Sequence, residues 1–223
     1  VTGADVDTVQ IEIVKTAYDS TQARADEEVK SIQYTIEQTG GVINIKYELP
    51  KSVNFRNNIN TVDFVITVPN ETTVDVETSF GDMAVANIKG SVTVSNDFGD
   101  VSVENIEGAL SVNNDSGEVQ ASAIKAGSEN IDLYSGFGKV TLEKASGADI
   151  TIDSNSGAIV LNDVRATGTL STDDDFGDTT YENGSAAILT IQSNSGKVSI
   201  TKVNVRDELK IENPHPNPKK LKF

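Results

Sequence analysis

Several residue types are missing or rare in this sequence, and each absence narrows the chemistry open to the protein. The 223 residues include no cysteine, no tryptophan and one histidine, His215. Disulfide bonds, thiolate metal sites and cysteine nucleophiles are therefore excluded. His215 lies among Pro214, Pro216 and Pro218, where no rigid scaffold would hold it as the base of a Ser-His-Asp triad.

Positive charge is also scarce: the sequence has 18 Lys and Arg and 34 Asp and Glu, which give a formal net charge of −16. Binding to nucleic acid or to an anionic membrane surface needs clustered Lys and Arg, so we expect neither partner. No apolar run approaches the roughly 18 residues of a membrane helix, so we expect no direct membrane insertion by this segment. The chain starts at Val1, and we expect that a signal segment has been removed.

A four-residue phrase centred on glycine recurs through the last two thirds of the sequence. Its seven copies are SFGD (79–82), DFGD (97–100), DSGE (115–118), GFGK (136–139), NSGA (155–158), DFGD (175–178) and NSGK (194–197). The glycines lie 18 to 21 residues apart, with a second glycine series between them. This regularity indicates a repeat architecture. We expect both glycine series to occupy corners where the backbone has positive φ.

Apolar residues alternate with polar ones between the glycines. Val92 and Val94 form one such pair, and Val101 and Val103 form the next. A period of two is typical of a strand with one buried face. A two-strand unit this short can bury that face only by stacking on copies of itself.

The repeat therefore predicts an all-β protein: a single-stranded parallel β-helix of about seven rungs of about 19 residues. The general chirality of parallel crossovers favours a right-handed helix. An antiparallel sandwich or barrel is the alternative, because short strands with frequent turn signals also suit that fold.

Three regions follow from this pattern: an N-terminal β-rich cap region (1–70), the β-helix repeats (71–212) and a Pro/Lys-rich tail (213–223). In the cap region we expect strands over 6–14, 30–37, 42–48 and 62–68. Gly40-Gly41 predicts a hairpin turn between the second and third of these strands. Residues 20–29 predict a short helix with Ser20 as its N-cap.

The segment VDFVITVPNETTVDVETSFGD (62–82), followed by rungs of the form G-x-V-x-V, resembles a large bacterial family of domains of unknown function. The strands VDTVQIEIV and GGVINIKYE fit the N-terminal part of that family. Its members are often labelled adhesins. The resemblance implies a β-helix, exported to the bacterial envelope as a periplasmic, surface or lipoprotein-anchored protein. The family has no assigned catalytic residues, so none is carried over.

Acidic residues surround the recurrent glycines. If the rungs stack in register, Asp82, Asp100, Glu118 and Asp178 line one edge, and Asp97, Asp115 and Asp175 lie on an adjacent line. Repelling carboxylates about 5 Å apart could bind calcium, which prefers oxygen ligands. The calcium candidates are Asp97, Asp100, Asp115, Glu118, Asp175 and Asp178. Lys139, Ala158 and Lys197 interrupt the line, so solvated turn acids are the favoured interpretation and no other cofactor is expected.

Four phenylalanines share the slot before the glycine: Phe80, Phe98, Phe137 and Phe176. Serine fills this slot in the other rungs. We expect the rings to pack in the core or at a corner. An outward orientation would instead make an aromatic stripe suited to contact with a sugar or a protein.

A catalytic site has little support. Asp173, Asp174 and Asp175 form the densest acidic cluster and could supply paired carboxylates for glycoside chemistry, although a charged turn is the favoured interpretation. We therefore expect a non-enzymatic cell-envelope or surface scaffold, in the manner of an adhesin, that presents a rigid polar face to a surface protein or glycan. The alternatives are a carbohydrate-active β-helix enzyme and a calcium-stabilised binding module.

Overall fold

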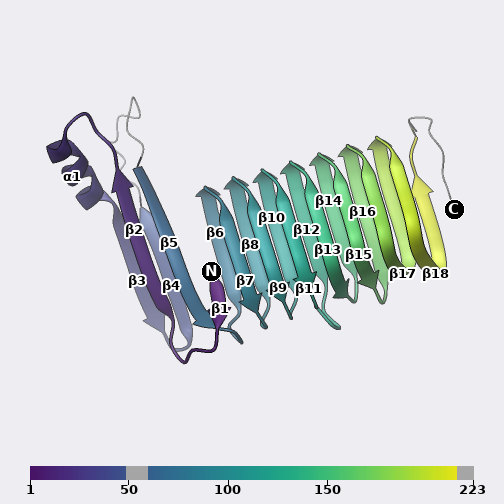
Figure 1. Ribbon diagram of the computed structural model, residues 1–223, viewed down its shortest axis with the longest axis horizontal. Coiled ribbons are helices and arrows are strands. Elements are labelled where there is room, and N and C mark those ends of the chain that lie inside the picture. Colours follow the sequence, from purple (N-terminus) through teal and green to yellow (C-terminus); the bar gives the residue numbers. More distant parts are fainter. Residues whose placement is uncertain (49–59, 215–223) are drawn as a thin grey trace. The chain divides into compact units, whose positions relative to one another are not determined.

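The computed structural model describes residues 1–48 and 60–214 (Figure 1). The chain forms two compact units: Val1–Val9 with Thr67–Phe223, and Gln10–Ile66. His215, Pro216 and Pro218, and with them most of the predicted tail, lie outside the described residues. In the described ranges, no helix is both long enough and apolar enough to cross a membrane.

The unit Gln10–Ile66 contains the helix and a two-stranded hairpin. Its elements are β2 (Gln10–Ala17), α1 (Gln22–Ser31), β3 (Gln33–Thr39), β4 (Val42–Glu48) and most of β5 (Asn60–Pro69). Antiparallel pairing of β3 with β4 ends at Thr39 and Val42, which confirms the turn at Gly40-Gly41. The strand expected over 6–14 is wrong in its start, because the chain forms β1 (Thr2–Ala4) and does not become extended again until β2.

The helix cap also differs from the prediction. Thr21, not Ser20, is the N-cap of α1, and its hydroxyl accepts the Arg24 N–H at 3.4 Å. Ser20 instead donates its hydroxyl to the Asp19 carboxylate at 2.7 Å. Because the Ser20 hydroxyl is bonded to Asp19, it does not cap the helix, and the helix begins one residue later.

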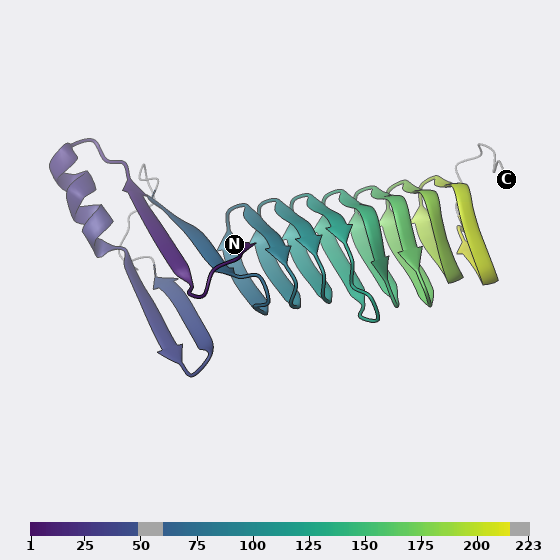
Figure 2. The ribbon, with the colours of Figure 1, turned by 60° about the horizontal axis from the view of Figure 1, so that its bottom comes forward.

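The larger unit is a parallel β-solenoid of about seven turns, in which each turn contributes one strand to each of two layers. The first layer contains β6 (Val74–Phe80), β8 (Val92–Phe98), β10 (Leu110–Ser116), β12 (Ile131–Phe137), β14 (Ile150–Ser156), β16 (Thr169–Phe176) and the second part of β17 (Thr179–Ser195). The second layer contains β7 (Met83–Ile88), β9 (Val101–Ile106), β11 (Val119–Ile124), β13 (Val140–Gly147), β15 (Ile159–Ala166) and the first part of β17. Figure 2 shows the two layers joined at their ends by short corners. The expected parallel β-helix is confirmed.

Both ends of the solenoid extend these layers. β18 (Val198–Glu212) pairs in parallel with both parts of β17. At the other end, β1 pairs with β7 through Thr2 and Ala86, and with the Thr67–Pro69 part of β5. The first residues of the chain therefore cover the edge of the second layer.

The core consists of columns of aliphatic side chains that follow the strand register. One column, with one member from each rung, is Val92, Leu110, Ile131, Ile150, Leu170 and Leu189. Its members are completely or almost completely buried, as the alternating pattern predicts. Aligned burial of this kind supplies most of the driving force for folding.

The two glycine series are required for different physical reasons. Gly99, in the recurrent phrase, has φ +134, and a Cβ there would clash with the Gly81 carbonyl. Most of the second series does not have positive φ, so that part of the expectation is wrong. Gly108 is required because the Gly90 backbone lies where its Cβ would be. Near the second glycine series, each rung instead has a non-glycine residue with positive φ. These residues are Asn87, Asn105, Ala123, Lys144, Asp163, Asn183 and Lys202.

Candidate functional site

The four recurrent phenylalanines form an exposed row, which we call the phenylalanine edge: Phe80, Phe98, Phe137 and Phe176. Between 53% and 72% of each side chain is exposed. The rings lie at the corner but are not packed there or in the core, so the outward alternative to the expected packing is correct. The strand leaves its alternating pattern at this corner, and the ring turns outward where continued alternation would have placed it inside.

Strand register fixes the order of side chains along this edge. From one rung to the next, the sequence is Phe80, Phe98, Ser116, Phe137, Ser156, Phe176 and Ser195. Phe80 and Phe98 occupy consecutive rungs, and their rings stack in parallel with centroids 5.3 Å apart and an interplanar angle of 9°. That separation is close to the strand spacing of about 4.8 Å, so the ring faces look along the solenoid axis.

Hydrogen bonds between the corners hold the row in place. The Gly81 N–H donates to the Phe98 carbonyl at 2.9 Å, and the Gly99 N–H donates to the Ser116 carbonyl at 2.9 Å. The same bond recurs in each later rung up to Gly177, which donates to Ser195. The rings therefore project from a backbone ladder that is bonded on both sides.

The corner acids take part in this ladder. The Asp82 carboxylate accepts the Asp100 N–H at 2.9 Å, and the Asp100 carboxylate accepts the Glu118 N–H at 2.8 Å. Asp178 accepts the Lys197 N–H at 2.8 Å. Each of these carboxylates thus satisfies a backbone donor of the next rung, a structural role that repeat spacing did not reveal.

The calcium candidates occupy the predicted lines. Asp100 lies between Asp82 and Glu118, and register places Asp97 beside Asp115. Asp175 and Asp178 lie three rungs further along, beyond Lys139 and Ala158. Within the described part of the chain, no group of three or more Asp, Glu, His or Cys side chains is arranged to hold a metal ion.

The acids are unevenly distributed along the phenylalanine edge. The three corners at 79–82, 97–100 and 115–118 contain five carboxylates and no Lys or Arg. The corners at 136–139 and 194–197 each contain one lysine, the corner at 155–158 has no charge, and the corner at 175–178 contains two carboxylates. The four later corners therefore carry no net charge, and the net negative charge of the edge is at its Phe80 end.

A column of polar side chains runs inside the solenoid just before each corner: Asn96, Asn114, Ser135, Ser154, Asp174 and Ser193. All are buried. Asn96 and Asn114 both donate an amide N–H to the Gly99 carbonyl, at 3.0 and 3.1 Å. Ser135 donates to the carbonyls of Gly117 and Gly138. The asparagine and serine residues before the glycines therefore satisfy corner carbonyls from the inside.

The Ser193 hydroxyl has no hydrogen-bond partner among the described residues, and Asp174 is the more consequential exception in this column. It is 0% exposed, and neither carboxyl oxygen makes a hydrogen bond of good geometry. Burial raises its pKa to about 6, and the charges of Asp175, Asp173 and Asp178 add to that shift. Burial also raises the pKa of Asp173, to which Asp175 contributes.

This arrangement separates the candidate catalytic carboxylates. Asp174 faces the interior of β16, whereas its neighbours Asp173 and Asp175 face outward and are half-buried. Paired carboxylates must both reach one substrate. Asp174 therefore cannot pair with either neighbour on a sugar, although the three carboxylates are close enough for their charges to interact.

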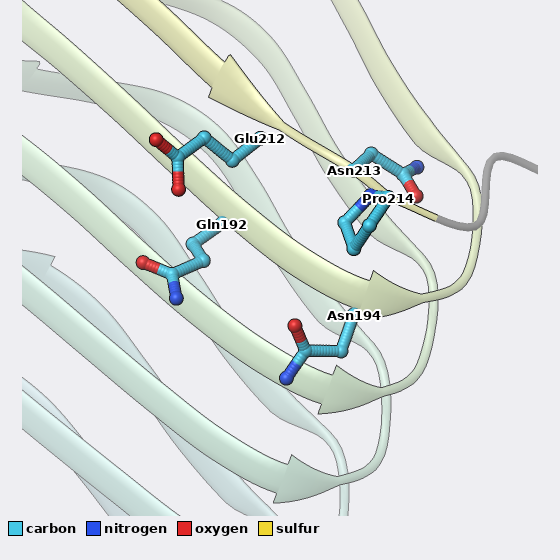
Figure 3. A pocket seen from close by; sticks show the side chains of 5 residues that line it. All are labelled: Gln192, Asn194, Glu212, Asn213 and Pro214. Atoms are coloured by element: carbon cyan, nitrogen blue, oxygen red, sulfur yellow. The ribbon is translucent and has the colours of Figure 1, made fainter.

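A small polar depression lies on the last rungs, next to the acidic corner at 175–178 (Figure 3). It measures about 380 Å³ and is lined by Gln192, Asn194, Glu212, Asn213 and Pro214. Asn213 donates its amide N–H to the Gly196 carbonyl, like the interior asparagines. The depression is open and contains one ionisable group, Glu212, so it offers no acid–base pair.

One sequence signal could have revealed the outward orientation. Phenylalanine and serine alternate at the same slot in consecutive rungs. A closely packed interior does not tolerate such large changes of volume without compensation. A slot that accepts both is therefore exposed.

Comparison with known families agrees with the fold. A family model described as Toastrack DUF4097 matches residues 4–217. The match confirms the resemblance to a family of domains of unknown function and carries no information on adhesion. Neither a search of curated proteins nor a search of solved structures found a match.

Proposed function

The chain belongs to the Toastrack DUF4097 family of domains of unknown function, and we propose that it is a non-catalytic interaction scaffold. Its contact surface is the phenylalanine edge. The observation that carries the proposal is the alignment of four aromatic side chains, each more than half exposed, along one line of the solenoid.

The fold does not need these rings. Ser116, Ser156 and Ser195 occupy the same slot, and the corners of Ser116 and Ser156 make the same backbone hydrogen bonds as the phenylalanine corners. Aromatic side chains are enriched in protein interfaces, and aligned apolar surface on a soluble protein marks a binding site. Contact with a partner explains rings that stability does not require.

The ladder suits this role because it fixes the spacing of the rings. Phe98 and Phe137 lie two rungs apart, as do Phe137 and Phe176, so each pair is separated by about 10 Å along the axis. A partner meets contacts that are already positioned, which reduces the entropy lost on binding.

Site-specific photo-crosslinking in the native host cell tests the proposal. A crosslinking residue at Ser156, on the edge, should capture a discrete partner, whereas one at the exposed Ser102 on the second layer should not. Changing all four phenylalanines to serine should abolish the Ser156 product and leave the thermal midpoint nearly unchanged. Equal capture at both sites, or capture that survives the four substitutions, would contradict the proposal.

Location at the bacterial envelope is part of this proposal, and it rests on the family resemblance. Fractionation of the native cells should recover the protein with envelope components. A protein found only with the cytosolic fraction would remove that part and leave the contact surface untouched.

A further inference from the structure

The phenylalanine edge contains a gap that has the chemistry of a cation-binding site. At Ser116 the row of rings is interrupted for one rung between Phe98 and Phe137. Asp115 and Glu118 lie on either side of Ser116 in the same corner. We call this place, formed by these five residues, the Ser116 gap.

The walls of the gap are aromatic. One face of the Phe98 ring is covered by Phe80, so its other face looks along the axis toward the Ser116 rung. Phe137 lies one rung beyond, so a group centred over Ser116 is about 4.8 Å from each wall along the axis. Cations are attracted to ring faces within about 6 Å of the centroid, so the Phe98 face is in range, and the Phe137 ring lies at a similar distance along the axis.

The sides of the gap are negative. Asp115 precedes Ser116 and Glu118 follows Gly117, and Asp97 and Asp100 occupy the matching positions one rung away. The Glu118 backbone N–H is bonded to Asp100, which fixes this part of the corner. On the opposite side, Lys139 occupies the position that matches Glu118 in the Phe137 rung, so the carboxylates are concentrated on the Phe98 side of the gap. Carboxylates beside aromatic faces favour a cation over a neutral or anionic group.

A second gap provides a comparison within the same chain. At Ser156 the row is again interrupted, between Phe137 and Phe176, but the flanking residues are Asn155 and Ala158. The flanking rungs again contain phenylalanine, and Asp175 and Asp178 occupy the matching positions one rung away, but the corner itself carries no charge. The two gaps therefore differ in whether their own corner supplies carboxylates.

We propose that the Ser116 gap binds the cationic side chain, an Arg guanidinium or a Lys ammonium, of a partner polypeptide. This inference rests on the proposed function and specifies the chemistry of the partner. Phe80 and Phe176 extend the apolar surface beyond the gap on both sides, which suits a polypeptide that continues along the edge rather than a free small cation.

The test uses the full chain and hexa-arginine as the probe, with hexa-citrulline as its uncharged analogue of similar size. Fluorescence anisotropy with labelled peptides measures both affinities. We expect hexa-arginine to bind and hexa-citrulline to bind at least about tenfold more weakly, because only the former has a charge to place between the rings. Equal affinities, or no binding of hexa-arginine at millimolar concentration, would overturn the inference.

Filling the gap locates the site. Ser116→Phe should complete the stack and weaken hexa-arginine binding about tenfold, since the added ring occupies the place of the cation. Ser156→Phe is the matched control and should change the affinity less than about twofold. Both variants should fold, because phenylalanine already occupies this slot in four rungs. If Ser116→Phe binds as tightly as the unaltered protein, the edge acts as a plain aromatic surface and the inference fails.

Charge removal completes the design. Asp115→Asn with Glu118→Gln should weaken binding and reduce its dependence on salt. Glu104→Gln with Glu182→Gln removes the same charge from exposed positions on the second layer and should have little effect. Equal weakening in both double variants would assign the binding to overall charge and refute the gap. If the proposal for the gap fails, the crosslinking test of the phenylalanine edge is unaffected and decides the proposed function separately.

Discussion

Replacement of Asp174 by asparagine should stabilise the protein near neutral pH. In the interior polar column, Asn96 and Asn114 donate an amide N–H to a glycine carbonyl, a bond that an ionised carboxylate cannot make. Asp174 is fully buried, and both of its oxygens lack a hydrogen bond of good geometry. Burial accordingly raises its pKa from 3.8 to about 6, although the nearby Phe176 backbone N–H partly opposes the shift.

The pKa shift gives both the sign and the size of the effect. Between pH 3.8 and about 6 the folded protein holds a proton on Asp174 that the unfolded chain releases. The free energy of unfolding therefore falls as pH rises through this window, and it stays lowered above it. A shift of about 2 pKa units corresponds to about 3 kcal/mol. Asp174→Asn has the same shape and does not titrate, so it avoids this loss.

Urea unfolding followed by circular dichroism, from about pH 4 to pH 7.5, measures the difference between the two proteins. We expect Asp174→Asn to be more stable by about 3 kcal/mol at the upper pH and by less than about 1 kcal/mol at the lower pH. Carboxylates far from Asp174 are common to both proteins and cancel in the difference. Glu104→Gln, at an exposed position of the second layer, is the control and should leave the pH dependence of the unaltered protein nearly unchanged. A difference that is independent of pH, or a less stable Asp174→Asn at neutral pH, would refute the reasoning.

Three further predictions concern the corners and the core. Ala123 has φ 55 and lies one rung from Asn105, whose amide already donates to Asn87 at 2.8 Å; Ala123→Asn should raise the free energy of unfolding by about 1 kcal/mol, and a decrease in urea unfolding would contradict this. Gly184 faces the Tyr181 ring and the Val164 carbonyl, so Gly184→Ala should lower the thermal midpoint. Combined with Tyr181→Leu it should cost less than the sum of the two single losses, and additive losses would show that the two sites are independent. Because Asp82, Asp100 and Asp178 already accept backbone N–H groups, millimolar calcium should not raise the thermal midpoint. A rise that Asp100→Asn removes would establish a calcium site.

Most of the solenoid could be predicted because its signals are repeated. Alternation placed pairs such as Val92 and Val94 in the core, and the glycine spacing set the register. Repetition averages out local exceptions, since a strand has to match its neighbours on both sides. The segment Gln10–Ile66 has no repeat, and there the helix cap and the first strand were wrong by a few residues.

The outward row and the interior carboxyl were missed for a common reason. Strict alternation continued from Leu170 and Thr172 places Asp174 inside, and from Asn96 it places Phe98 inside. Alternation is right for Asp174 and wrong for Phe98. In each rung the chain turns just after the polar position, so Asn96 or Asp174 is the last residue to face the core. The phenylalanine that follows it already belongs to the corner. Side-chain hydrophobicity alone would place the phenylalanine inside and the polar residue outside. Backbone geometry overrides it, since an inward Asn or Ser satisfies a glycine carbonyl that a phenylalanine would leave unpaired. The need to satisfy the corner backbone thus places polar groups inside and releases the aromatic slot to the surface, where folding accepts either phenylalanine or serine.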